Sequence, residues 1–235
     1  MNTKTTMRSY DDFCLVLQEA GFSLAGGNDS GIYSVLPFDW AQEPPSDSPI
    51  RWHTGDPETD PWQWRVRVLA ERDDVAYAKL FFGKSGYITR SWYPHFLAVR
   101  RGGRSFEDDY DDGQFSRAAR RIFQAVSARG ELAVHDIKGE AGFGREEASA
   151  FSKALVELQA RMYITVCGEQ PKISASGSAN GWMSMVYCPT ETFFPGIWDE
   201  ANGLDYREAY EAIAAQARRL NPNVDARKLK KFIEG

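Results

Sequence analysis

The chain has 235 residues, 43% of them hydrophobic, and its 33 acidic side chains outnumber 28 basic ones, for a formal net charge of −5. This content suffices for one large core or two small ones, and the negative charge argues against a protein that coats nucleic acid along its whole surface. We find no signal-peptide pattern and no apolar stretch of about 18 residues, so we expect a soluble, cytoplasmic protein without a membrane anchor. The cysteines and histidines have no metal-ligand spacing and no nucleotide-binding glycine motif is present, so we expect neither a metal nor a cofactor.

The N-terminal segment, residues 1–113, is predicted to be mixed α/β with a tryptophan-rich loop. Residues 8–20 have helical spacing that ends at Gly21, residues 32–38 resemble a strand, and residues 62–70 are helical again. Between them, prolines deny residues 40–61 regular structure. We favour a loop that covers the domain. The alternative is a stacking platform or pocket, for which the candidates are Trp62, Trp64, Tyr87 and Trp92.

Residues 75–104 contain six cations interleaved with aromatic side chains and no acidic residue. A surface that follows phosphates and stacks on bases requires this combination. Aromatic core residues flanked by ordinary surface cations explain it equally well, and the sequence leaves both readings open. The next segment, residues 106–112, has five carboxylates without the spacing of a calcium loop, and we expect a solvated linker there.

Residues 114–190 have the order of elements of a winged helix-turn-helix. A helix starts after Ser116 and stops at Gly130, a short element and a glycine-rich turn follow, and a longer helix runs from about residue 145 to 162. Two β-rich runs, 163–167 and 181–188, flank a polar loop at 168–180. The longer helix has a predicted buried stripe of Phe151, Leu155, Leu158 and Met162.

The predicted class is therefore α+β, with a winged helix at 114–190 between the mixed segment and a C-terminal helix and basic tail at 191–235. In such a module the third helix enters a major groove, which makes duplex DNA the expected partner. The predicted contacts are Arg145, Lys153 and Arg161 on that helix, Lys172 and Ser174 on the wing, and Lys79, Lys84 and Arg90 from the basic window. Because glutamates cancel the cations of the long helix, the window and the basic tail would have to supply phosphate contacts.

Three stretches resemble a known bacterial family: Asp60-Pro61-Trp62-Gln63-Trp64-Arg65, the segment 77–88 (YAKLFFGKSGYI), and Leu155-Val156-Glu157-Leu158-Gln159 with Tyr163-Ile164. Together they resemble the small proteins called AlkZ-related, over most of residues 8–220. These proteins are distantly similar to tandem winged-helix alkylpurine and crosslink DNA glycosylases, a similarity confined here to the winged-helix pattern and residues 79–88. The resemblance implies DNA affinity and a link to DNA damage.

The glycosylases carry a catalytic Gln-x-Gln or Gln-x-Asp pair, and no glutamine of this chain has Gln or Asp two residues later. The family's catalytic residues therefore have no counterpart here, and we expect no efficient excision of alkylated bases. Asp60, beside two tryptophans and a cation, is the one substitute, although Asp60-Pro61 is better explained as a helix N-cap and first-turn proline. The alternatives to a DNA-binding protein are a glycosylase without the usual pair and a small-molecule or protein-binding module on a winged-helix scaffold.

Overall fold

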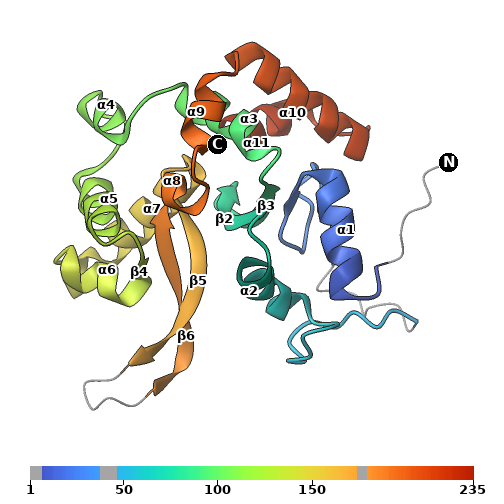
Figure 1. Ribbon diagram of the computed structural model, residues 1–235, viewed down its shortest axis with the longest axis horizontal. Coiled ribbons are helices and arrows are strands. Elements are labelled where there is room, and N and C mark those ends of the chain that lie inside the picture. The colour runs from blue at the N-terminus through green and yellow to red at the C-terminus, as the bar shows by residue number, and fades with distance from the viewer. Residues whose placement is uncertain (1–6, 38–46, 174–178) are drawn as a thin grey trace.

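The computed structural model describes residues 7–37, 47–173 and 179–235, and its centre is a six-stranded antiparallel sheet of order β1-β3-β2-β5-β6-β4 (Figure 1). The strands are β1 (Phe22–Leu24), β2 (Val75–Phe81), β3 (Lys84–Thr89), β4 (Leu132–Ala133), β5 (Ile164–Ile173) and β6 (Ala179–Pro189). The two edge strands are the shortest. A single register pair, Tyr77 with Val166, joins β2 to β5 and so makes one sheet of two three-stranded units.

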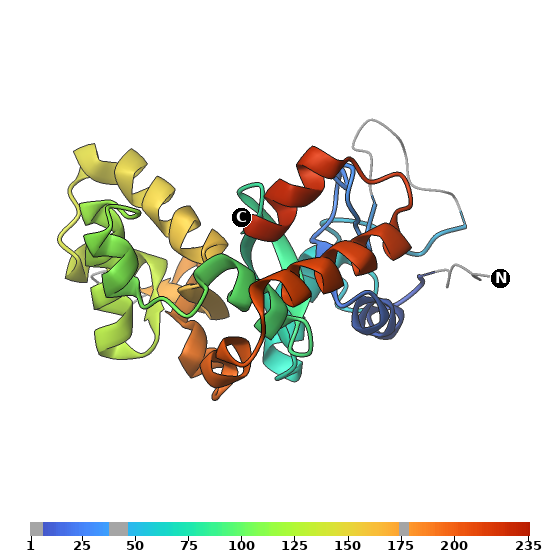
Figure 2. The same cartoon turned by 90° about the horizontal axis from the view of Figure 1, so that it is seen from above.

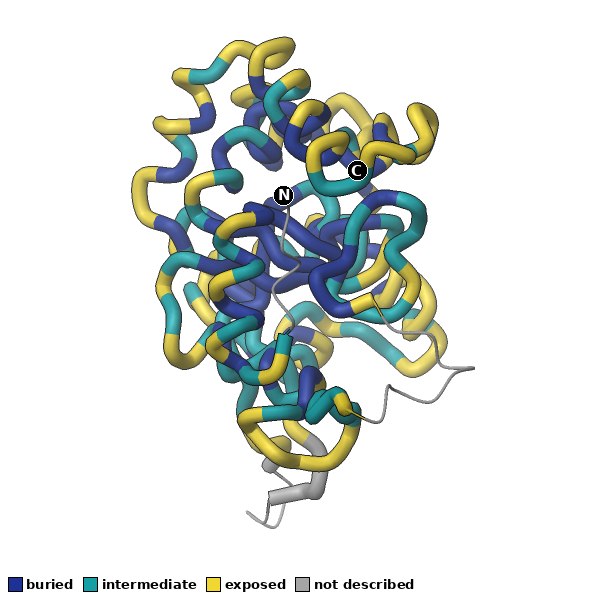
Figure 3. Tube along the Cα trace, turned by 90° about the vertical axis from the view of Figure 1, so that its right-hand side faces the viewer, coloured by how far each residue is buried: buried dark blue, intermediate teal, exposed yellow. Residues whose placement is uncertain are grey.

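The helices around this sheet, seen from above in Figure 2, form two groups that belong to two hydrophobic clusters of buried side chains. Figure 3 shows that the buried residues are concentrated in the middle of the molecule. One group is α1 (Tyr10–Ala20), α2 (Pro61–Glu71), α5 (Arg117–Arg129), α6 (Val134–Glu140) and α7 (Ala148–Ala160). The other is α3 (Tyr93–Arg101), α9 (Ile197–Asn202), α10 (Tyr206–Leu220) and α11 (Ala226–Glu234). Strand β2 separates the clusters, because Val75 and Tyr77 belong to the first while Ala76 and Ala78 belong to the second. The mixed α/β class predicted from the sequence is confirmed at this level.

Local signals explain the ends of the helices that were predicted best. The Ser116 side chain accepts a hydrogen bond from the Ala119 N–H, and Gly130 ends α5 with a positive φ of 77°. The longer helix begins with a 3-10 turn, η1 (Arg145–Glu147), and continues as α7. Its predicted apolar stripe, Phe151, Leu155, Leu158 and Met162, is buried as expected.

Two predicted boundaries are wrong. Residues 168–180 were expected to be a loop, but β5 continues to Ile173 and β6 begins at Ala179, because these polar residues pair across a long hairpin. Residues 32–37 form only isolated bridges, such as the one between Leu24 and Ser34, and contribute no strand.

The acidic segment is folded, which corrects its interpretation as a solvated linker. Ser105 and Asp108 form a reciprocal capping box at the start of α4 (Phe106–Asp111). Asp109 is buried and accepts hydrogen bonds from Arg104 (2.5 Å), Tyr163 (2.7 Å) and Arg161 (2.9 Å). Burial acts to raise the pKa of Asp109, but these three donors outweigh it and the net pKa is lowered. The short α8 (Thr190–Phe193) completes the set of described helices.

Arg100, in the last turn of α3, links both helical groups to the sheet. Its guanidinium is 4% exposed and donates to four backbone carbonyls, those of Leu80 (2.9 Å), Ala160 (2.8 Å), Phe232 (2.7 Å) and Ile233 (2.9 Å). Three of these carbonyls lie at or next to the C-terminal ends of α7 and α11, where helices lack internal donors and carry partial negative charge. Burial lowers the pKa of Arg100 below its ordinary value.

Within the described ranges, none of the helices has the length and apolar character needed to cross a membrane.

Candidate nucleic-acid interface

The exposed side of α7 is the first part of the candidate interface. The helix buries one face against α5 and β2, whereas Arg145 at the start of η1 and Lys153 in α7 are exposed to solvent. The small polar residues Ser149 and Ser152 are exposed on the same helix. Short polar side chains and cations at the start of a helix are suited to phosphate and base-edge contacts.

Two charged residues of this helix segment, Glu147 and Arg161, form hydrogen bonds or ion pairs with other parts of the protein. Glu147 accepts a hydrogen bond from Arg121 (2.6 Å) and another from the Gly144 N–H (3.0 Å). These bonds, chiefly the one from Arg121, lower the pKa of Glu147. Arg161, a predicted DNA contact, is instead half-buried and paired with Asp109. Arg145 and Lys153 therefore remain as the solvent-exposed cations that were predicted for this helix.

The tight turn between β2 and β3 lies directly beside α7. Its central residues, Phe82 and Gly83, have φ values of 54° and 70°. A Cβ atom on Gly83 would lie 3.9 Å from Val156 Cγ1 of α7, and the Lys79 N–H donates to Gln159 Oε1 at 2.9 Å. The exposed Lys79 and Lys84 thus lie near the turn that borders α7.

The other four cations of the 75–104 window are held by the protein. Arg90 pairs with Glu200, and Arg101 pairs with Glu191 (2.5 Å) between the rings of Tyr163 and Trp198. Arg104 pairs with Asp109 and Asp112, and Arg100 is buried. The acids missing from the window are supplied by other segments, so Arg90 is an ion-pair residue and the window contributes Lys79 and Lys84 to the exposed basic surface.

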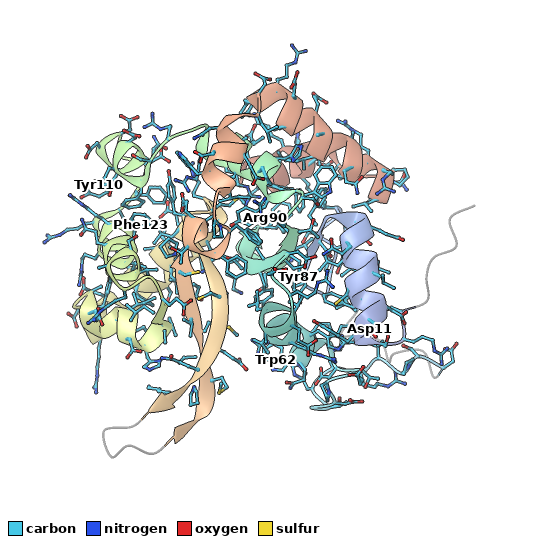
Figure 4. All side chains as sticks on the ribbon, in the orientation of Figure 1. Asp11, Trp62, Tyr87, Arg90, Tyr110 and Phe123 are labelled. Atoms are coloured by element: carbon cyan, nitrogen blue, oxygen red, sulfur yellow. The ribbon has the colours of Figure 1, made fainter. Side chains whose placement is uncertain are left out.

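The four aromatic candidates do not gather around one pocket. Trp64 and Tyr87 are fully buried in the first cluster, with Trp64 stacked on Phe13 at 5.2 Å. Trp92 packs edge-on against Phe22 in the second cluster. Trp62, labelled on α2 in Figure 4, is 43% exposed. The Arg65 guanidinium lies over its ring, 4.1 Å from the ring centre. The alternative of a stacking platform or pocket named these four residues as candidates, and it is wrong for Trp64 and Tyr87, whose rings form the core.

The β5–β6 hairpin is the remaining part of the interface. It extends beyond the neighbouring helices (Figure 1), and Lys172 near its far end is exposed. The other predicted contact on this hairpin, Ser174, lies outside the described residues.

Asp60 is the N-cap of α2, and Pro61 follows as the first helical residue. Its carboxylate is fully buried and accepts from the backbone N–H groups of His53 (3.0 Å), Gly55 (2.9 Å) and Trp62 (2.8 Å). Both oxygens are occupied in this way, which leaves the group far from the exposed setting that water activation beside a flipped base requires.

We expect the substitution Asp60→Asn to lower the free energy of unfolding by about 1–2 kcal/mol, because one carboxylate oxygen becomes an amide that faces a backbone N–H. Urea denaturation followed by circular dichroism measures this change. The matched control is Asp73→Asn, an exposed carboxylate just after the same helix. Equal stability of the two variants would show that the cap does not stabilise the loop and helix.

No three described His, Cys, Asp or Glu side chains are grouped closely enough to hold a metal ion. Cys14, Cys167 and Cys188 are free thiols. The arrangement presents exposed cations, small polar groups and a projecting hairpin.

The fold and these exposed groups define a mixed α/β protein in which one helix, a tight β-turn and a hairpin present basic residues. A family model described as AlkZ related matches residues 7–234, so the chain belongs to the AlkZ-related family. This membership indicates a glycosylase-like fold related to DNA repair. Comparisons with curated proteins and with solved structures gave no match.

Proposed function

We propose that this protein binds duplex DNA through the winged helix predicted at residues 114–190. The order α5, β4, α6, α7, β5, β6 is that of the module, and β4 pairs with β6, which pairs with β5. In this assignment α7 is the helix that enters the major groove and the β5–β6 hairpin is the wing.

The observation that carries the proposal is the placement, among the described residues, of exposed basic side chains without ion pairs where such a module meets DNA. Arg145 and Lys153 on the helix and Lys172 on the wing are all exposed, and no ion pair is recorded for these three described residues. Lys79 and Lys84 extend this basic surface across the β2–β3 turn that touches α7. About five phosphate contacts are within the reach of such a set.

We place no chemical step on this surface. The family's glutamine pair has no counterpart in the sequence, and the Asp60 carboxylate is buried and used as a helix cap. The proposal is therefore recognition of DNA, in keeping with the family's relation to DNA repair.

We expect duplex binding to be strongly salt-dependent. With about five phosphate contacts, each releasing about 0.9 counterion, affinity should fall by about 10²–10³-fold between about 50 and 200 mM salt. The double substitution Arg145→Gln and Lys153→Gln should reduce the slope of log affinity against log salt by about 2. Fluorescence anisotropy with a labelled duplex measures both quantities.

The control replaces Arg207 and Arg218, two exposed arginines of α10, by glutamine. This pair has the same charge change but lies in the other helical group, so its slope should stay at the wild-type value. Absence of wild-type binding at low ionic strength would refute the proposal. Equal slopes for the two double variants would remove α7 from the interface.

A further inference from the structure

A second basic site lies beside the β2–β3 turn, at the surface of α11. It is a pocket of about 540 Å³ formed by the loop before residue 32, the turn itself and one side of α11. Four cations line it: Lys84 from the turn, and Arg227, Lys228 and Lys231 from α11. The other lining residues are Asn28, Ser30 and Phe82.

The charge of this pocket is uncompensated by the described residues that line it, since none of them is acidic. Two acids lie on the flanking segments, and both accept hydrogen bonds from backbone N–H groups. Asp29 accepts from the Gly31 N–H (2.7 Å), and Asp225, the N-cap of α11, accepts from the N–H groups of Arg227 and Lys228 (both 2.9 Å). The Lys228 N–H and the charges of Lys228 and Arg227 lower the pKa of Asp225, so this carboxylate offsets part of the positive charge of the pocket. Four like charges around one hollow raise the local concentration of anions.

The polar groups inside the pocket are hydrogen-bond donors that suit an anion. The Lys84 ammonium donates to Ser30 Oγ at 3.1 Å, which links the turn to the opposite wall. Asn28 and Ser30 add neutral donors beside the cations. A guanidinium and several ammonium groups together match the charge and the several acceptor oxygens of a phosphate group.

Phe82 gives the pocket an aromatic wall at the cost of an unusual backbone conformation. In two-residue hairpin turns with both central φ values positive, Asn, Asp or Gly is the usual first residue, yet here it is Phe82 with φ 54°. Its half-buried ring lies 6.2 Å from the Phe232 ring of α11 and lines the pocket. Strain of this kind is concentrated at functional sites.

We propose that this pocket binds the phosphate group of a nucleotide, with the four cations on the phosphate oxygens and Phe82 beside the sugar or base. The phosphate has two possible sources. One is the backbone of a DNA strand held on α7, which lies on the same side of the molecule as α11 (Figure 2), and this source rests on the proposed function. The other is a free nucleotide, which does not.

The free-nucleotide arm of the test uses the full chain with AMP and with pyrophosphate, each titrated by calorimetry. Lys228→Gln combined with Lys231→Gln removes two pocket cations on exposed positions of α11. The control on the same helix is Lys230→Gln, which removes one exposed cation that lies 3.9 Å from Glu234 and does not line the pocket. Where the source is a free nucleotide, the double variant should bind about tenfold more weakly or worse, and the control should stay within about twofold of the wild type.

The DNA arm repeats the salt titration of duplex binding with the same variants. Where the source is the DNA backbone, the double variant should lose about 2 from the salt slope while Lys230→Gln retains the wild-type slope. A loss of AMP or pyrophosphate affinity, or a smaller salt slope of duplex binding, in the double variant supports the pocket. The arm in which the loss occurs identifies the source of the phosphate. The pocket assignment is overturned if the double variant binds as well as the wild type in both arms. It is also overturned if the wild type binds neither AMP, nor pyrophosphate, nor the duplex. If only duplex binding is absent, the proposed function fails and the AMP and pyrophosphate titrations still decide the pocket.

The role of the ring is tested separately with Phe82→Ala, after thermal unfolding has shown that the variant is folded. A ring beside the base or sugar predicts weaker AMP binding with unchanged pyrophosphate binding. Equal AMP affinity in the variant and the wild type would overturn the assignment of Phe82.

Discussion

Replacement of Arg100 by methionine is expected to lower the free energy of unfolding by about 3–5 kcal/mol, the range for breaking a buried charged network. Methionine fills much of the space but cannot donate to the carbonyls of Leu80, Ala160, Phe232 and Ile233, which stay buried without their partner. Urea denaturation, followed by both circular dichroism and tryptophan fluorescence, measures the loss.

Two further variants isolate the cause. Arg100→Lys keeps the charge but loses the fork of donors, so it should also be strongly destabilised. Arg218→Met makes the same change as Arg100→Met at an exposed site of α10, and it should stay within about 0.5 kcal/mol of the wild type. A loss below about 1 kcal/mol for Arg100→Met would show that water or backbone movement satisfies the four carbonyls.

Alkaline unfolding is expected to begin close to pH 10 and to be steep. Burial raises the pKa of eight tyrosines. The five whose pKa is raised most are Tyr187, to about 12, and Tyr10, Tyr87, Tyr93 and Tyr163; Tyr33, Tyr206 and Tyr210 are shifted less. The stability that these groups contribute is fully present below the unfolded pKa of about 10. Above it the folded chain retains protons that the unfolded chain releases, so stability is lost as pH rises. Five protons correspond to a slope of about 7 kcal/mol per pH unit.

Arg100 acts in the opposite sense, because its pKa is lowered on folding. The thiols of Cys14 and Cys188, whose pKa values are raised on folding, act in the same sense as the tyrosines, so the groups that destabilise at high pH outnumber Arg100. The measurement is a titration that follows tyrosinate absorbance and circular dichroism together. The buried tyrosines should ionise only as the helical signal disappears. Tyrosinate absorbance that is complete while the helical signal is intact would contradict the prediction.

Tyr87→Phe is the control for this titration. The Tyr87 hydroxyl is buried and has no hydrogen-bond partner among the described residues. The substitution keeps the ring in the core, so stability at neutral pH should be equal or slightly higher. At alkaline pH the slope should fall by about one fifth, since one of five titrating groups is gone.

The sequence predicted best those features that depend on neighbouring residues. Ser116 and Gly130 mark the ends of α5, and the 3.6-residue spacing of α7 identified its buried face, because capping and periodicity are local properties. The long hairpin was missed because its polar strands have no such periodicity and depend on pairing across residues such as Glu169 and Met185.

The candidate site was less predictable because charge partners come from distant segments. Arg90 pairs with Glu200, which is 110 positions away, so a window without acids looked more basic than it is. The basic tail was recognisable from composition, but its position against Lys84 and Ser30 depends on the packing of α11. Tertiary contacts of this length leave no periodic or local trace in one sequence.

The layout of the sheet also bears on self-association in concentrated solution. Sheet edges with unpaired backbone groups recruit strands from other molecules, and proteins protect them with short edge strands, proline and charge. Here the outer strands are short: β1 has three residues and β4 has two, so each offers few backbone groups to another chain. Beyond Val166, where β5 has no described partner on its β2 side, the strand carries Glu169, Pro171 and Lys172. The exposed part of the hairpin is thus a poor template for a strand of another molecule, the pairing that leads to fibrils.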